Sequence, residues 1–186
     1  MPSKIFQALI GHVAPDPNRD GMKETPDRAA EAWRFWCSGY TVDGAALLKT
    51  FEDGAEGVDQ LVVMCDIPMY SHCEHHLAPF FGRVCIGYIP SGRIVGLSKM
   101  NRLVECFSRR LQTQERISNQ IADCMNDTLK PAGVGVIIKA RHMCVESRGV
   151  RHQGSTTTPS ALRGVLRDEP DARAEFFSLA KFEAQI

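Results

Sequence analysis

Apolar positions in the first part of the chain recur every three to four residues, which is typical of helices that bury one face. The spacing predicts two N-terminal helices, over residues 1–11 and from Thr25 to Gly39. The second begins at a Thr-Pro pair, which indicates Thr25 as the N-cap and a proline in the first turn. Residues 15–21 are rich in helix breakers, so a turn is expected between the two helices.

Beyond Val58 the pattern changes to short apolar runs and to alternation with a period of two, which favours strands. Strands are predicted over residues 61–65, 80–89, 93–97, 134–140 and 162–166. Helical spacing returns behind Ser98, which is expected as an N-cap, and again over residues 114–129 and 170–182. This order predicts an α+β fold with a largely antiparallel sheet and helices on one face. One domain is expected over residues 22–186, after a short N-terminal arm over residues 1–21.

Composition argues against several classes of function. The 186 residues carry 22 Lys and Arg against 22 Asp and Glu, so the net charge is zero. A nucleic-acid-binding protein usually shows a basic excess, so nucleic acid is not expected as a partner. No apolar run approaches the ~20 residues of a membrane span, and the N-terminus lacks the layout of a signal peptide. We therefore expect a cytoplasmic protein without a membrane partner.

The seven cysteines are an odd number in a chain that is long enough to form a core without cross-links. A reducing compartment favours free thiols or metal ligands over disulfides. Cys65, Cys85, Cys106 and Cys124 lie in apolar surroundings, so we expect them to be small core residues.

The densest cluster of metal-binding residue types is Cys73-Glu74-His75-His76, and His142-Met143-Cys144 follows the strongest predicted strand. Two thiolates and one imidazole suit catalytic zinc, which commonly has three protein ligands and an open position for water. Cys73 and His76 are three residues apart, close enough in a turn to hold one ion. Spacing alone does not decide which histidine is the ligand or whether Cys144 joins the site. A structural role for the cluster is the alternative.

A second pattern involves basic residues at an expected helix start. Ser98 and Lys99 offer backbone N–H groups, the helix dipole and an ammonium group to an anion. Arg102 follows one turn later on the same face. This set resembles a phosphate clamp, although a solvated helix face has the same pattern. Glu115 opens the next predicted helix, where compensation of the helix dipole explains it without any ligand.

Five stretches between residues 22 and 182 resemble the GTP cyclohydrolase I family, in the family's order. They are Glu24-Thr25-Pro26 with Arg28; Cys73-Glu74-His75-His76-Leu77 with Pro79-Phe80 and Gly82; Gly96-Leu97-Ser98-Lys99 with Arg102; Arg110-Leu111-Gln112 with Gln114-Glu115-Arg116; and His142-Met143-Cys144 with Arg148-Gly149-Val150. The resemblance covers nearly the whole chain, and five motifs in the same order make it specific.

The resemblance implies a role for each candidate residue. Zinc would be held by Cys73, His76 and Cys144, and the catalytic residues would be His75, His142 and Ser98. The triphosphate of GTP would be bound by Arg28, Lys99, Arg102 and Arg148. The guanine edge would be recognised by Gln114 and Glu115, with Glu115 as a buried anchor.

The resemblance also implies a fold, an assembly and a reaction. The fold would be the T-fold (tunnelling fold), assembled as a toroidal homodecamer of two pentamers with active sites at subunit interfaces. Zinc-activated water would attack C8 of GTP, formate would leave, and ribose rearrangement with ring closure would give 7,8-dihydroneopterin triphosphate. His142 is expected to protonate N7, while His75 and Ser98 shuttle protons later. Folate, biopterin and deazaguanine routes all start from this reaction, and the motifs do not distinguish them.

Other interpretations fit the residues less well. A pyruvoyl-pterin synthase would need three histidine ligands, and a nitrile-reducing relative would need a different cysteine motif. A structural zinc site usually has four protein ligands, so His72 or His75 would have to join it. An iron-dependent cyclohydrolase of a separate family is disfavoured by the soft thiolates. His72 is expected to be solvated, and the short arm argues against feedback by a separate regulatory protein.

Overall fold

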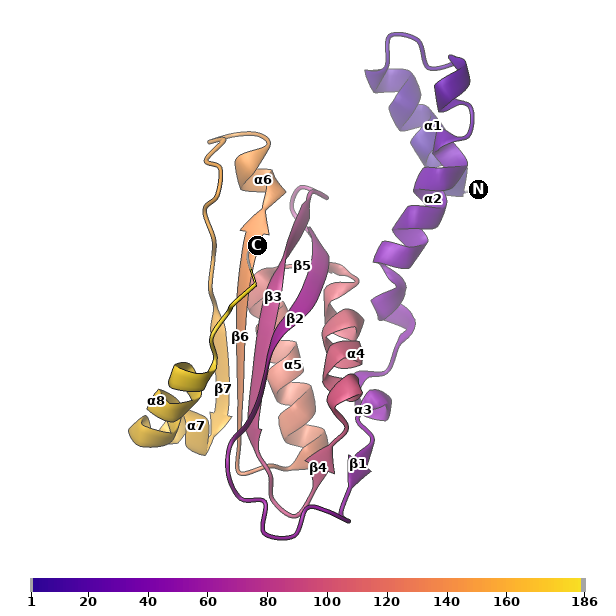
Figure 1. Ribbon diagram of the computed structural model, residues 1–186. Helices are drawn as coiled ribbons and strands as arrows, with labels where there is room; N and C mark the ends of the chain where they lie inside the picture. The colour runs from indigo at the N-terminus through magenta and orange to yellow at the C-terminus, as the bar shows by residue number, and fades with distance from the viewer. Residues whose placement is uncertain (1, 185–186) are drawn as a thin grey trace. The chain divides into compact units, whose positions relative to one another are not determined.

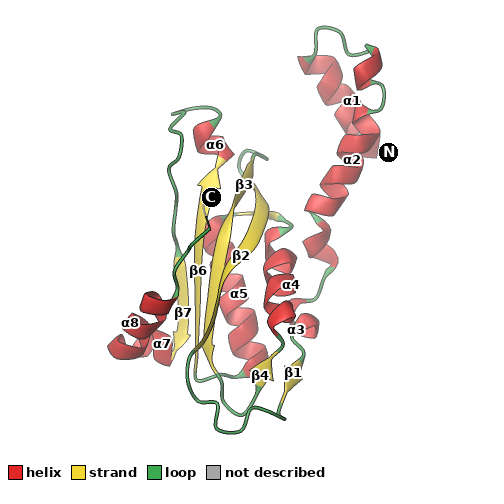
Figure 2. Ribbon diagram, in the orientation of Figure 1, coloured by secondary structure: helices red, strands yellow, loops and turns green. Residues whose placement is uncertain are grey.

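The chain divides into two compact units, the first ending at Ser38 and the second beginning at Gly39. The computed structural model describes residues 2–184. Figure 1 traces the chain through both units, and Figure 2 separates helices from strands. All strands of the described residues lie in the second unit, which therefore holds the sheet.

The N-terminal unit is a helical hairpin of α1 (Pro2–Val13) and α2 (Thr25–Trp36), joined through the short 3-10 helix η1 (Asp20–Met22). Both helices agree with the sequence prediction. The expected N-cap is wrong, because Glu24 occupies that position and Thr25 is the first helical residue. Backbone N–H groups in the first turn have no partner within the helix, so proline, which lacks this group, is tolerated throughout that turn. The helix can therefore start at Thr25, with Pro26 as its second residue.

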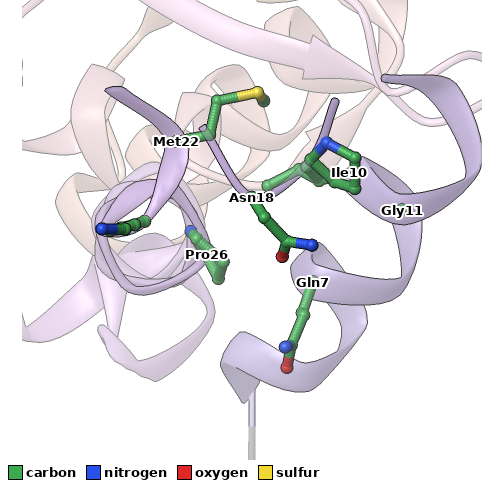
Figure 3. A pocket seen from close by; sticks show the side chains of 8 residues that line it. Gln7, Ile10, Gly11, Asn18, Met22 and Pro26 are labelled. Carbon is green, nitrogen blue, oxygen red and sulfur yellow. The ribbon is translucent and has the colours of Figure 1, made fainter. Parts of the chain in front are cut away.

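A pocket of about 400 Å³ lies between α1 and the beginning of α2 (Figure 3). Its lining mixes the polar Gln7 and Asn18 with the apolar Ile10 and Met22. An apolar stripe of α1 is exposed, and it consists of Ile5, Leu9 and Val13. None of the helices in residues 2–184 has both the length and the apolar run that crossing a membrane requires.

The second unit is built on a curled five-stranded sheet with the order β5-β2-β3-β6-β7. Its strands are β2 (Val62–Cys73), β3 (Pro79–Ile89), β5 (Leu111–Gln112), β6 (Gly133–His142) and β7 (Ser160–Gly164). All pairs are antiparallel except β5 with β2, which is parallel. Two short strands, β1 (Thr50–Phe51) and β4 (Ile94–Val95), form a separate ribbon.

The helices of this unit include two long ones that cover one face of the sheet. They are α3 (Gly44–Leu47), α4 (Leu97–Ser108), α5 (Gln114–Leu129), α6 (Met143–Glu146), α7 (Val165–Asp168) and α8 (Pro170–Leu179), with η2 (Ser38–Thr41) before them. The bounds of α5 agree with the prediction. Ser98 is not the N-cap of α4, because Gly96 caps it in an extended conformation and Ser98 lies in the first turn.

Alternation along β3 separates the two faces of the sheet. Val84, Ile86 and Tyr88 are buried in the main core with residues of α4 and α5. A fully buried aliphatic side chain contributes about 1.5–3 kcal/mol relative to exposure, so burial of this layer stabilises the packing of α4 and α5 on the sheet. Cys85 points to the opposite face, into a second cluster.

The second cluster contradicts the expectation that helices cover one face only. Phe176 of α8 is fully buried against the other side of the sheet. Gly87 and Gly135 are paired across β3 and β6, and a Cβ on either would lie within 2.7 Å of the Phe176 ring. Because neither glycine has a side chain, the sheet presents a flat surface on which the Phe176 ring packs. Apolar periodicity does not reveal this feature.

Cys65 and Cys85 were expected to be free core thiols, but they form a disulfide with a Cα–Cα distance of 4.0 Å. The register of β2 and β3 shifts between Met64 and Ile67, which brings Cys65 beside Cys85 on the face covered by α8. The prediction failed because it rested on composition, and strand register was not known. Cys106 and Cys124 are free and lie in or against the protein interior.

Reduction of this disulfide is expected to lower the free energy of unfolding by about 2–3 kcal/mol. The cross-link closes a loop with a sequence separation of 20, and removing it restores that entropy to the unfolded chain. Urea unfolding with and without a phosphine reductant measures the change. The double variant Cys65→Ser/Cys85→Ser is the control, because it should unfold alike in both buffers; a reductant effect of equal size there would contradict the assignment.

Candidate metal and catalytic site

The turn between β2 and β3 brings two candidate ligands together. Cys73 ends β2, donates its N–H to the carbonyl of Ala78 at 2.8 Å and accepts one from Leu77 at 2.8 Å. Leu77 adopts a left-handed φ of 55°, which closes the turn. The sulfur of Cys73 consequently lies 3.5 Å from Nδ1 of His76 and 3.8 Å from Nδ1 of His75.

The third candidate ligand arrives through the pairing of β3 with β6. Phe80 faces His142 in this register, and α6 begins at the next residue, so Cys144 follows at the same edge of the sheet. The ligand atoms of Cys73, His76 and Cys144 all lie within 4.8 Å of one another. This is the combination that spacing alone left open.

The donor set of this group fits a zinc ion. Two sulfur atoms and one imidazole nitrogen match the three-ligand pattern of catalytic zinc, which leaves a fourth position for water or substrate. Burial raises the pKa of the Cys144 thiol, and the neighbouring Cys73 raises it further. A divalent cation reverses this effect, because it favours both thiolates at once. His75 stands beside the group, with Nε2 at 3.8 Å from the carboxylate of Glu74.

A pocket of about 200 Å³ opens next to the three ligands. The predicted residues that line it are Cys73, His75, His76, Gln114, Glu115, His142 and Cys144. Thr113 caps α5 by accepting the N–H of Arg116, and so fixes Gln114 and Glu115 in the first turn beside this pocket. The catalytic candidates His75 and His142 and both guanine-edge candidates thus lie beside the metal group within one chain. Ser98, the third catalytic candidate, is not among the residues that line the pocket.

His142 is half-buried and held in a fixed plane. Its ring stacks on Phe80 with centroids 4.7 Å apart and an interplanar angle of 5°. Burial lowers the pKa of His142, and the charge of Glu115 partly opposes that shift. A neutral imidazole at this position can exchange a proton near neutral pH.

Gln114 is buried, with 1% of its surface exposed. Its Nε2 donates to the carbonyls of Ile138 at 2.9 Å and Thr157 at 3.0 Å, while Oε1 meets Nε2 of His142 at 2.7 Å. All three partners lie on other segments of the chain, so the sequence offered no signal for them.

One ion pair in the site was missed by the sequence reasoning. Arg116 of α5 donates two hydrogen bonds to the carboxylate of Glu74, at 2.5 and 3.0 Å. These bonds hold the pKa of Glu74 below its usual value. Glu74 lies inside the ligand turn and Arg116 follows Glu115, so the pair ties the metal group to the helix that carries the guanine-edge candidates. The two residues are 42 positions apart, and only their placement in neighbouring motifs hinted at a contact.

The phosphate candidates are divided between different places. Arg148 follows α6 and lies close enough to Cys144 to lower its pKa electrostatically. Ser98, Lys99 and Arg102 begin α4, which follows β4 at the other end of β3 from the ligand turn (Figure 1). β3 has 11 residues, and at ~3.3 Å per residue this separates the two ends by roughly 33 Å. Arg28 belongs to the N-terminal unit, where it pairs with Glu24.

Two expectations about burial are wrong for the single chain. Glu115 is exposed and not buried. His72 is buried, with 7% of its surface exposed, because it lies within β2 opposite Pro79. A solvated histidine was predicted there from residue type, which carries no information on the extent of the strand.

Known proteins resemble this chain over nearly its whole length. A family model described as GTP cyclohydrolase I matches residues 3–181. The GTP cyclohydrolase 1 of Nitrosospira multiformis is 53% identical over 176 residues, covering 95% of this chain and 92% of the relative. The GTP cyclohydrolase 1 of Campylobacter jejuni serotype O:6 is 48% identical over 182 residues, covering 97% and 94%. The archaeosine synthase QueF-Like in the apo form has a TM-score of 0.47 at 18% identity, over 56% of this chain and 93% of that one.

The fold is of the mixed α+β class, and it brings together a Cys-His-Cys group that could hold a metal ion beside a pocket. The chain belongs to the GTP cyclohydrolase I family.

Proposed function

We propose that this protein converts GTP to 7,8-dihydroneopterin triphosphate with release of formate. Membership of the GTP cyclohydrolase I family supports the activity. The observation that carries the proposal is the pocket where Cys73, His76 and Cys144 converge with His142 and Glu115. These groups supply the three needs of the reaction: a metal site, a proton-transfer group and a carboxylate for guanine.

Zinc is the proposed cofactor, held by Cys73, His76 and Cys144. Bound zinc lowers the pKa of water toward ~7 and so supplies a nucleophile for purine C8 at neutral pH. His142 gives a proton to N7 of the purine, which makes C8 more electrophilic. His75, exposed at the edge of the pocket, serves the later ribose and ring-closure steps as a proton shuttle.

Guanine recognition is assigned to Glu115, whose carboxylate accepts the N–H groups of the base edge. An analogue that lacks these donors would leave the carboxylate unpaired, at a cost of about 1–3 kcal/mol or more. The triphosphate and ribose are bound by Arg148, which lies near the metal group, together with Arg28, Lys99, Arg102 and Ser98.

The spread of these anion-binding residues supports an oligomeric enzyme. Ser98, Lys99 and Arg102 begin α4 at the far end of β3, so a second copy of the chain is needed to bring them to the pocket. The exposed apolar stripe of α1 is further surface for subunit contact. We propose the homodecamer of two pentamers with sites at subunit interfaces, in which Glu115 becomes buried. Cytoplasmic localisation stays a prediction.

The test is incubation of zinc-loaded protein with GTP, followed by oxidation and fluorescence detection of neopterin, with formate measured in parallel. Neopterin and formate in equal amounts are expected. Formate without neopterin would limit the activity to opening of the purine ring. Neither product from protein with full zinc content would refute the proposed function.

A further inference from the structure

The buried carboxamide of Gln114 has its orientation fixed by its neighbours. Its Nε2 lies within hydrogen-bonding distance of two backbone carbonyl oxygens, those of Ile138 and Thr157. A carbonyl oxygen only accepts, so this atom must be the NH₂ group and not the amide oxygen. The other end of the carboxamide, which meets His142 at 2.7 Å, is therefore the oxygen.

The orientation of Gln114 in turn decides where His142 carries a proton. An amide oxygen accepts but does not donate, so Nε2 of His142 must be the donor in this contact. In the neutral ring, Nδ1 is then the nitrogen with the free electron pair. Phe80 stacks on the same ring with an interplanar angle of 5°, which favours the ring plane in which Nε2 meets the Gln114 oxygen.

We propose that Gln114 is a positioning residue that holds His142 as the Nε2–H tautomer, and that its side chain does not bind guanine. Both N–H bonds of its carboxamide go to the protein backbone and its oxygen goes to His142, so every polar group is used within the chain. Gln114 is also almost wholly buried, whereas its neighbour Glu115 is exposed at the pocket. The proposal rests on the proposed function only for its kinetic consequences.

The arrangement has a chemical consequence for proton transfer. The bond from Nε2–H to the Gln114 oxygen is kept whether or not the other nitrogen carries a proton. His142 therefore exchanges protons with a ligand through Nδ1 alone: Nδ1 first takes up a proton from water, and the resulting imidazolium gives this proton to N7 of the purine. Nδ1 keeps the bonding electron pair, so the ring returns to the neutral Nε2–H tautomer. An orientation fixed in advance avoids the loss of rate that follows when a catalytic group must first be oriented.

The direct test is magic-angle-spinning ¹⁵N NMR of zinc-loaded protein labelled in its histidines. The resonances of His142 are identified by their absence from the His142→Asn variant. A protonated Nε2 and an unprotonated Nδ1 are expected in the neutral ring. The opposite tautomer, or a mixture of the two, would overturn the proposal.

Replacement of Gln114 adds a second readout. Gln114→Met keeps the length of the side chain but removes the oxygen, so His142 should give averaged signals of both tautomers. We expect kcat to fall by about 10–100-fold and KM for GTP to change by less than about threefold. The control is Gln120→Met, which removes a half-buried carboxamide of α5 that accepts a hydrogen bond from Gln112 and lies outside the pocket lining, and which should leave the His142 spectrum unchanged.

The outcomes separate this proposal from the proposed function. A higher KM at unchanged kcat, with an unaltered His142 spectrum, would assign Gln114 to guanine binding and overturn the positioning role. If the protein made no neopterin but showed the Nε2–H tautomer, which Gln114→Met abolishes, the positioning role would stand and the proposed function would fail.

Discussion

Replacing Cys144 with alanine is expected to remove zinc and to reduce neopterin formation by more than about 10³-fold. The three ligand atoms lie within 4.8 Å of one another, and the loss of one sulfur leaves only two neighbours from the β2–β3 turn. Without the metal, water at neutral pH keeps its ordinary pKa and is a poor nucleophile for purine C8. Cys73→Ala should have the same effect, because it removes the other sulfur.

Metal content by atomic absorption and product formation from GTP measure this prediction together. Cys124→Ala is the matched control: it deletes a free thiol of α5 that packs against the main core, outside the metal group. The control should keep about one zinc per chain and full turnover. A Cys144→Ala protein with unchanged zinc content and activity would remove this residue from the site, however close its sulfur lies to that of Cys73.

The local parts of this structure could be predicted from the sequence. The bounds of α5 follow from helical periodicity over residues 114–129, and β3 follows from alternation. Cys73 and His76 approach each other because one turn contains both. The approach of Cys144 was not derivable from spacing, since it depends on the antiparallel register of β3 and β6. Only the resemblance to the family supplied it.

Apart from the two N-caps, the features that were missed depend on contacts between distant segments. The pairing of Cys65 with Cys85 depends on a register shift, and the packing of Phe176 depends on two facing glycines. The partners of Gln114 lie 24 to 43 residues away. Periodicity describes which face a residue takes but not which residue it meets. The burial of Glu115 depends further on what covers this surface, which one chain does not determine.

Replacement of His142 separates proton transfer from metal binding. His142 is not one of the three metal ligands, so His142→Ala is expected to keep the zinc content of the unmodified protein. Turnover of GTP should nevertheless fall by about 10²–10⁴-fold, which is the range for loss of a general acid or base. Both formate and neopterin should be lost, because protonation of N7 precedes both products.

Zinc content, formate and neopterin must be measured on the same preparation of each variant. The control is His12→Ala, which removes an exposed imidazole of α1 and should change none of these three quantities. Loss of zinc from His142→Ala would mean that the ring supports the metal group, and the kinetic loss would then say nothing about proton transfer. Formate at the normal rate without neopterin would move His142 from N7 protonation to the later ring closure. Only loss of both products with zinc retained assigns the first proton transfer to His142, because Cys144→Ala loses both products together with the metal.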